Sequence, residues 1–440
     1  MHSGIFRFLI WGDYDQTFVR TNFSHMPLYP AVHLLFLKVF GSTDSRLLLV
    51  LNYLLAYLSI INISNILRLE GRQKIFLIFV TFNPLIYHYT NIIRPEWLNI
   101  FLLTCIWRAL ASSRFIVAGC LLALAGLTHH FAVFFVPCVA FIIWHRETGW
   151  VRRLYGVGLV ALTTTICMSP YIYYVISNWA DFKLQLVTNQ LPESVSNSNW
   201  KYVKSFLVPL FFPSVGPYNY AGRIARWQVD LPAVAVIASI VAIILKRVRH
   251  IKASPVTVEA GALWLFLNLG CSVTTYGVYV TFFLTVFAVS LLRDIFPDVA
   301  PAVRKWVLVF AAILIAYQIF FYATVFTKIF KTADFKEAVR CLSADIPQFA
   351  KTYVLANPDP SVELKNLRPD LDIRRYVDFE KYSDRWKAVV PDNKYFVISA
   401  DKNVLDRYDY GAVLRTERKK GALKEKACDV GNSHFLVWSR

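Results

Sequence analysis

The sequence predicts an α-helical polytopic membrane protein with a small α/β domain at its C-terminus. Of its 440 residues 56% are apolar and 17% are charged, so the chain is more apolar and less charged than a typical soluble protein. Apolar windows recur up to Phe330, and from Lys331 the composition becomes that of a soluble domain. We therefore expect a transmembrane domain over residues 1–330 and an α/β domain over residues 331–440.

The apolar windows predict about ten spans, since a helix needs about 20 residues to cross a bilayer. Windows 113–128 and 130–144 are short, so we expect tilted helices or flanking residues that snorkel. The apolar run from Leu28 to Phe40 is brief and predicts an interfacial helix ahead of the first span. The windows are 44–67, 75–93, 95–111, 113–128, 130–144, 154–178, 229–246, 256–271, 274–292 and 306–327.

Basic residues fill every second connection between these windows, which is the pattern expected of cytoplasmic loops. The net charge of +18 arises mostly there, and it indicates contact with membrane lipids rather than nucleic acid. The other connections and the tail are then extracytoplasmic. The basic residues are Arg68, Arg72, Lys74, Arg108, Arg114, Arg146, Arg152, Arg153, Lys246, Arg247, Arg249, Lys252, Arg293, Arg304 and Lys305.

With ten spans and an external tail, the N-terminus must also be external. Met1–Ile10 is too short for a spanning helix or a signal peptide. We therefore expect one further helix to be encoded upstream of Met1.

The tail shows helical periodicity over 334–346 and strand-like runs at 353–355, 395–398 and 435–438. It contains no Gly-rich phosphate loop and no nucleophile elbow, so we assign it no chemistry. Of the seven cysteines only Cys341 and Cys428 fall in this polar tail. One disulfide between them is possible but is not implied by the spacing.

Three carboxylates fall close to the extracytoplasmic surface. Asp13 and Asp15 are two residues apart, so in an extended loop they face the same way. Glu96 follows Pro95 and belongs to the first turn of a helix, where the helix dipole favours an acid. Partial desolvation raises the pKa of a carboxylate toward neutrality, which suits a general base. The alternatives are a solvated loop for the aspartates and an ordinary helix-start residue for Glu96.

Other external residues could bind substrates. Arg94, Arg223 and Arg226 could hold a phosphate, because a guanidinium matches its oxygens; interfacial snorkelling is the alternative for each. The adjacent His129 and His130 lie at the tip of a predicted hairpin and could bind a phosphate or a divalent metal. No further ligand accompanies them in the sequence, so the metal is left open, and no other cofactor is implied.

Six short runs stand out along the first part of the chain: Asp13-Tyr14-Asp15, His25-Met26-Pro27-Leu28-Tyr29, Phe40-Gly41 with Arg46, Asn83-Pro84-Leu85, Arg94-Pro95-Glu96 and Leu127-Thr128-His129-His130. In this order they resemble one family, the polyprenol-phosphate-sugar-dependent glycosyltransferases of the GT-C fold. The resemblance is greatest to the protein O-mannosyltransferase and aminoarabinose-transferase branch, which is glycosyltransferase family 39-like. That branch has adjacent Asp-Glu in its first loop and a His-Pro-Pro-Leu-Tyr-like run after it, so Asp13-Tyr14-Asp15 and Met26 are departures.

The resemblance implies a hexosyl or pentosyl transferase of cell-envelope glycan biosynthesis. It would be a multi-pass protein of the plasma membrane, the inner membrane of a bacterium, with its tail extracytoplasmic. A sugar would pass from a polyprenyl-phosphate donor to a lipid, glycan or protein acceptor with inversion. Asp13, Asp15 and Glu96 would be catalytic, with Asp13 as the base. The residues expected to bind substrates are His25, Tyr29, Arg94, His129, His130, Arg223 and Arg226.

Two other functions remain open. A lipid or polysaccharide transporter would carry ionisable residues within its spans, whereas the predicted spans hold almost no acids at their centres. An oligosaccharide polymerase would differ mainly in using a diphosphate-linked donor. The distribution of acids therefore favours chemistry at the external surface over transport.

Overall fold

The structure is a computed structural model, and it divides into two compact units, residues 23–325 and residues 1–22 with 326–440. We describe each unit by itself. The described residues are 26–41, 46–71, 95–183, 253–270, 277–295, 332–355, 367–375, 395–399, 424–430 and 433–439, with single positions between 73 and 90, between 305 and 320, and at 364.

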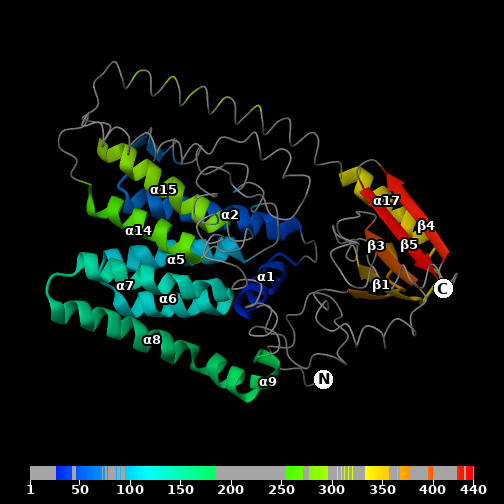
Figure 1. The fold of residues 1–440 in the computed structure, drawn as a ribbon, viewed down its shortest axis with the longest axis horizontal. Helices are drawn as coiled ribbons and strands as arrows, with labels where there is room; N and C mark the ends of the chain where they lie inside the picture. Colours follow the sequence, from blue (N-terminus) through cyan, green and yellow to red (C-terminus); the bar gives the residue numbers. More distant parts are fainter. Residues whose placement is uncertain are drawn as a thin grey trace, which may run out of the picture. The chain divides into compact units, whose positions relative to one another are not determined.

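The first unit is a bundle of helices (Figure 1) in which α5 is the central element. Helix α5 packs against α2, α6, α7 and α15, while α8 covers α6, and α14 packs on α7 and α15. The elements are α1 (Leu28–Val39), α2 (Arg46–Ile66), α5 (Glu96–Ala111), α6 (Phe115–Thr128), the 3-10 helix η2 (His130–Phe134), α7 (Phe135–Arg146), α8 (Trp150–Ser177), α9 (Trp179–Phe182), α14 (Pro255–Gly270) and α15 (Gly277–Ile295).

The helices run up and down, so the bundle has two opposite ends. Helices α2, α5, α7 and α15 end, and α14 begins, around one shared pocket. We call this the basic end, because Arg68, Arg108, Arg146 and Arg293 lie there. At the opposite end α5 begins at Glu96 and α6 ends at Thr128; we call it the Glu96 end. The expected hairpin tip is observed, since His129 separates α6 from η2.

Buried side chains of α5 form much of the core. Trp97 and Trp107 are exposed by 1% and 0% of their surface. Helices α6 and α8 approach closely at Gly119, where a Cβ atom would lie 2.7 Å from the Cβ of Thr163 and 2.9 Å from the Val160 carbonyl oxygen. Alanine at position 119 would therefore force the two helices apart.

Two helices are long and apolar enough to cross a membrane by length and composition: Leu47–Ile66 in α2 and Trp150–Ser177, which is α8. The other apolar helices that this search found among the described residues are shorter, namely Leu28–Val39, Phe115–Thr128 and His130–Arg146. Of the ten spans expected from the sequence, two therefore correspond to described helices that are long and apolar enough to cross a membrane.

The second unit contains a five-stranded sheet with the strand order β2-β1-β3-β5-β4. Strand β1 pairs in parallel with β2 and β3, and β5 pairs antiparallel with β3 and β4. Helix α17 packs against β4 and β5, and a disulfide joins Cys341 of α17 to Cys428 of β4. The elements are α17 (Thr332–Ala344), β1 (Lys351–Leu355), β2 (Asp372–Arg375), β3 (Tyr395–Ser399), β4 (Lys424–Val430) and β5 (Ser433–Ser439).

Candidate active site

Four of the predicted site residues belong to the part of the chain that the structure describes, and all four lie in the helical unit. They are Glu96, Tyr29, His129 and His130. The other six lie outside the described residues: Asp13, Asp15, His25, Arg94, Arg223 and Arg226.

Glu96 is the first residue of α5, directly after the N-cap residue Pro95. Its side chain is buried, with 1% of its surface exposed. A carboxylate in the first turn interacts favourably with the helix dipole, but removing it from water costs free energy unless polar groups surround it. Glu96 is therefore an enclosed acid, unlike the solvent-facing residue with which most helices begin.

Two further polar side chains near Glu96 are buried and were not predicted from the sequence. Asn99 lies three residues after Glu96, so the two share one face of α5. Within the described residues, neither the side-chain amide of Asn99 nor Nε1 of Trp97 has a hydrogen-bond partner. A buried polar group left unpaired costs about 1–3 kcal/mol. These groups are therefore available to donate to, or accept from, a bound polar ligand.

The two adjacent histidines lie between α6 and η2. Nδ1 of His129 accepts a hydrogen bond from the backbone N–H of Phe131 at 3.0 Å, so this side chain caps η2. In the neutral ring Nδ1 is then the acceptor and Nε2 carries the proton. The ring of His130 lies 4.2 Å from that of His129. Among the described residues no group of three His, Cys, Asp or Glu side chains could hold a metal ion.

Aromatic contacts fix η2, α5 and α15 against one another at the Glu96 end. The ring of Phe131 stacks on Tyr279 with centroids 4.3 Å apart. Trp97 meets Phe282 edge to face at 5.9 Å. Such pairs each add about 0.5–1.5 kcal/mol beyond the area that they bury. The histidine turn and the start of α5 are thus held in a defined relation.

Helix α1 contributes Tyr29 and His33, which are four residues apart and share one face. Both are buried, and their ring centroids lie 3.8 Å apart. Neither ring nitrogen of His33 has a hydrogen-bond partner in the described part of the chain. Burial lowers the pKa of His33 to about 4, so the ring is neutral at pH 7 and offers one donor and one acceptor.

We expect the stability of the helical unit to fall as the pH is lowered from about 6.5 to about 4. The unfolded chain protonates His33 near its ordinary pKa of 6.5, whereas the buried ring stays neutral down to about pH 4. In this window the unfolded state binds more protons, so the free energy of unfolding falls by at most about 1.4 kcal/mol per pH unit. Melting temperatures of the detergent-purified protein should depend less on pH in His33→Phe. Equal pH slopes for the two proteins would contradict this expectation.

Comparisons with known proteins identify one fold. No family model matches the sequence, and no curated protein matches it. The crystal structure of ArnT from Cupriavidus metallidurans bound to undecaprenyl phosphate is similar over 95% of this chain and 88% of that chain, with a TM-score of 0.55 and 13% identity. The apo structure of the same protein gives a TM-score of 0.39 over the same shares. On the first of these similarities, the chain has an ArnT-like fold, which supports the GT-C fold expected from the sequence.

Proposed function

We propose that this protein is a membrane glycosyltransferase that takes a sugar from a polyprenyl-phosphate-linked donor. The observation that carries the proposal is the similarity in fold to ArnT, whose structure contains undecaprenyl phosphate. The acceptor would be a lipid, glycan or protein on the extracytoplasmic side. The family 39-like branch, and with it inversion at the anomeric carbon, follows only from the resemblance of the short sequence runs.

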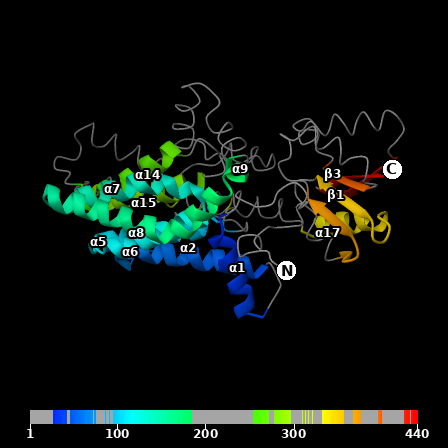
Figure 2. The same ribbon diagram turned by 90° about the horizontal axis from the view of Figure 1, so that it is seen from below.

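The surface of α8 supports a membrane location. This helix lies along the lower edge of the bundle in Figure 1 and in front of the other helices in Figure 2, which is seen from below. Exposed apolar side chains occur along its whole length, among them Val151, exposed by 80%, Ile166 by 62% and Tyr173 by 74%. An exposed apolar surface of this length would associate in water, whereas it matches the hydrocarbon layer of a bilayer.

The enclosed carboxylate of Glu96 supports chemistry at its end of the bundle. In the proposed reaction Asp13 accepts the proton of the acceptor hydroxyl, which attacks the anomeric carbon from the face opposite the phosphate. The bond from that carbon to the phosphate oxygen breaks, and the polyprenyl phosphate leaves with an added negative charge. Arg94, Arg223 and Arg226 are the candidates to stabilise this charge. Asp15 and Glu96 are the other two carboxylates that we propose to be catalytic.

Asn99 and His33 would help to position the polar parts of the substrates. Both are buried at or near the Glu96 end, and both have unpaired polar atoms within the described residues. A sugar presents several hydroxyl groups, each of which can donate and accept a hydrogen bond. Binding it would therefore remove the cost of leaving these side chains unpaired.

The donor class is the property to test. The purified full chain, in nanodiscs, would be incubated with undecaprenyl-phosphate hexose or pentose, or with a diphosphate-linked oligosaccharide, and a cell-envelope extract as acceptor. We expect sugar transfer with release of undecaprenyl phosphate from the first donors only, and slower transfer in Glu96→Gln. Release of a diphosphate product would instead identify a polymerase. Movement of the intact lipid-linked sugar across the membrane of vesicles, without cleavage of its sugar–phosphate bond, would identify a transporter.

A further inference from the structure

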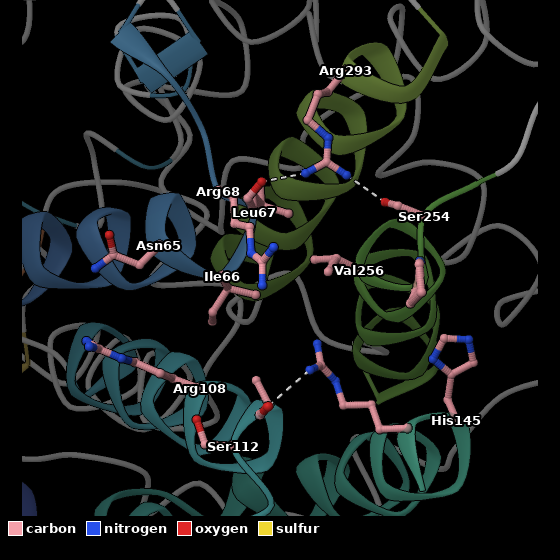
Figure 3. A pocket seen from close by; sticks show the side chains of 13 residues that line it. Asn65, Ile66, Leu67, Arg68, Arg108, Ser112, His145, Ser254, Val256 and Arg293 are labelled. Carbon is pink, nitrogen blue, oxygen red and sulfur yellow. Dashed lines mark hydrogen bonds between the residues drawn. The ribbon is translucent and has the colours of Figure 1, made fainter. Parts of the chain in front are cut away.

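A polar pocket with a volume of about 850 Å³ lies at the basic end, the end of the bundle opposite Glu96. Arg68, Arg108, Arg146 and Arg293 line it, and they come from the ends of four different helices or the residues beside them (Figure 3). His145 adds an imidazole, and the lining contains no Asp or Glu among the described residues. Cavities of this size commonly hold small molecules or the headgroups of larger ones.

Arg146 is held in place by a buried acid on another helix. Glu259 of α14 is 0% exposed and accepts hydrogen bonds from Nε of Arg146 at 2.6 Å and from Nη2 at 2.7 Å. Nε1 of Trp107 donates to the same carboxylate at 2.7 Å, and Nδ1 of His145 lies 3.3 Å from it. This bidentate pairing fixes the guanidinium before any ligand arrives.

Arg293 is fixed in a similar way. Its Nη2 atom donates to Oδ1 of Asp294 at 2.8 Å and to the hydroxyl of Ser254 at 2.6 Å. Its Nη1 atom donates to the carbonyl oxygen of Leu67 at the end of α2. The arginine therefore ties together the ends of α2 and α15 and the start of α14.

Arg68 and Arg108 are not neutralised by acids in the described part of the chain. Nη1 of Arg108 donates to Oδ1 of Asn62 at 3.1 Å, while no ion pair of either arginine is found among the described side chains. The four arginines carry four positive charges and the two neighbouring acids, Glu259 and Asp294, carry two negative charges. Counted over the described residues, the pocket therefore keeps an excess of two positive charges.

The backbone at Arg68 is unusual and brings this side chain to the pocket. The N–H of Leu69 bonds to the carbonyl of Ser64 and that of Arg68 to Asn65, which is the Schellman arrangement at the end of α2. Arg68 occupies its left-handed position with φ of 50°, where glycine is favoured. Figure 3 shows the guanidinium of Arg68 directed into the pocket. A residue other than glycine in the left-handed conformation favours a functional role for its side chain.

We infer that this pocket binds a phosphate-bearing ligand, either the headgroup of an anionic phospholipid or a soluble phosphate compound. Basic residues that only set membrane orientation need to be near the surface, but they have no reason to converge on one cavity or to be fixed by buried acids. Guanidinium groups match the oxygens of a phosphate in paired hydrogen bonds. Two negative charges on such a ligand would balance the excess charge of the pocket.

The experiment measures binding to the detergent-purified full chain with two probes. Inorganic diphosphate would be titrated by calorimetry, and mixed micelles with phosphatidylglycerol or phosphatidylcholine would be compared by the shift in melting temperature. We expect saturable binding of diphosphate or of phosphatidylglycerol, weakened about 10- to 100-fold in Arg68→Gly and in Arg108→Gln. Arg68→Gly leaves the fold intact, because glycine suits the left-handed position.

The matched control is Arg114→Gln, which removes one exposed positive charge at the N-cap of α6 without touching the pocket lining. It should bind as the unchanged protein does. Diphosphate binding alone would identify a soluble phosphate compound, and phosphatidylglycerol binding alone would identify a lipid headgroup. Equal losses in Arg114→Gln and Arg68→Gly, or no saturable binding of either probe to the unchanged protein, would overturn the inference. Neither outcome bears on the sugar transfer proposed for the Glu96 end.

Discussion

Asp13→Asn is expected to lower the turnover of sugar transfer by about 10²–10⁴-fold while leaving donor binding nearly unchanged. The amide keeps the shape of the side chain but cannot accept the proton of the acceptor hydroxyl. Asp15→Asn should have a smaller effect if Asp15 only orients the acceptor or tunes its neighbour, and Glu96→Gln should fall between the two. Steady-state rates with a polyprenyl-phosphate sugar would measure each effect.

The arginines provide the contrast in that experiment. Arg223→Ala and Arg226→Ala should raise KM for the donor more than they lower kcat, because a phosphate contact acts in the ground state as well as in the transition state. A base changes kcat, so the two roles separate in one set of measurements. Wild-type turnover in both Asp13→Asn and Asp15→Asn would show that the first loop is a solvated turn and that the base lies elsewhere.

Glu259→Ala is expected to lower the free energy of unfolding of the helical unit by about 3–5 kcal/mol. The change leaves Arg146 without its acid and Nε1 of Trp107 without its acceptor at a position that is 0% exposed. The guanidinium of Arg146 keeps 23% of its side-chain surface in contact with solvent, so the lower part of this range is expected. Denaturant unfolding in detergent, followed by tryptophan fluorescence, would measure the loss.

The paired change provides the control for this prediction. Glu259→Leu together with Arg146→Met replaces the ion pair by apolar side chains of similar size, and it should recover part of the lost stability. The isosteric Glu259→Gln should lie between, because its amide oxygen can still accept from Trp107. If Glu259→Ala unfolds at the same denaturant concentration as the unchanged protein, the pairing contributes nothing to the fold.

The helix boundaries were largely predictable, because apolar windows end where charged residues begin. Windows 95–111, 113–128 and 256–271 lie within two residues of α5, α6 and α14 at each end. The convergence of basic residues on one pocket was not predictable, since the spacing within a chain does not say which helices become neighbours. Glu259 shows the same limit. It lies 113 positions from Arg146. The sequence around either residue does not indicate that the two side chains form an ion pair.

In the sheet of the second unit, the central strands were predictable from the sequence and the edge strands were not. The strand-like runs at 353–355, 395–398 and 435–438 fall within β1, β3 and β5, the three central strands. Strands β2 and β4 were missed, and these are the two edges of the sheet. Edge strands commonly carry charged residues that discourage pairing with other chains. Asp372–Arg375 and Lys424–Val430 follow this rule and therefore lack the apolar signal of a strand.

The candidate site was predictable in part. Glu96 stands out because an acid follows Pro95 at the start of an apolar window, and the structure finds it buried. Asn99 and Trp97 were not predicted as site residues. A single side chain with a polar group inside an apolar window does not by itself indicate a site. The usable signal was the three-residue spacing between Glu96 and Asn99, which places both on one face of a helix.

The bond between Cys341 and Cys428 has a consequence for how the chain matures. The two cysteines are 87 positions apart, and closing a loop of that length removes unfolded-chain entropy equivalent to about 4–5 kcal/mol. Such a bond forms and persists where thiols are oxidised, and it is rare where glutathione keeps them reduced. We therefore expect the second unit to reach its full stability only in an oxidising compartment. Expression in a reducing compartment would then yield a chain whose helices are intact and whose tail is sensitive to proteolysis.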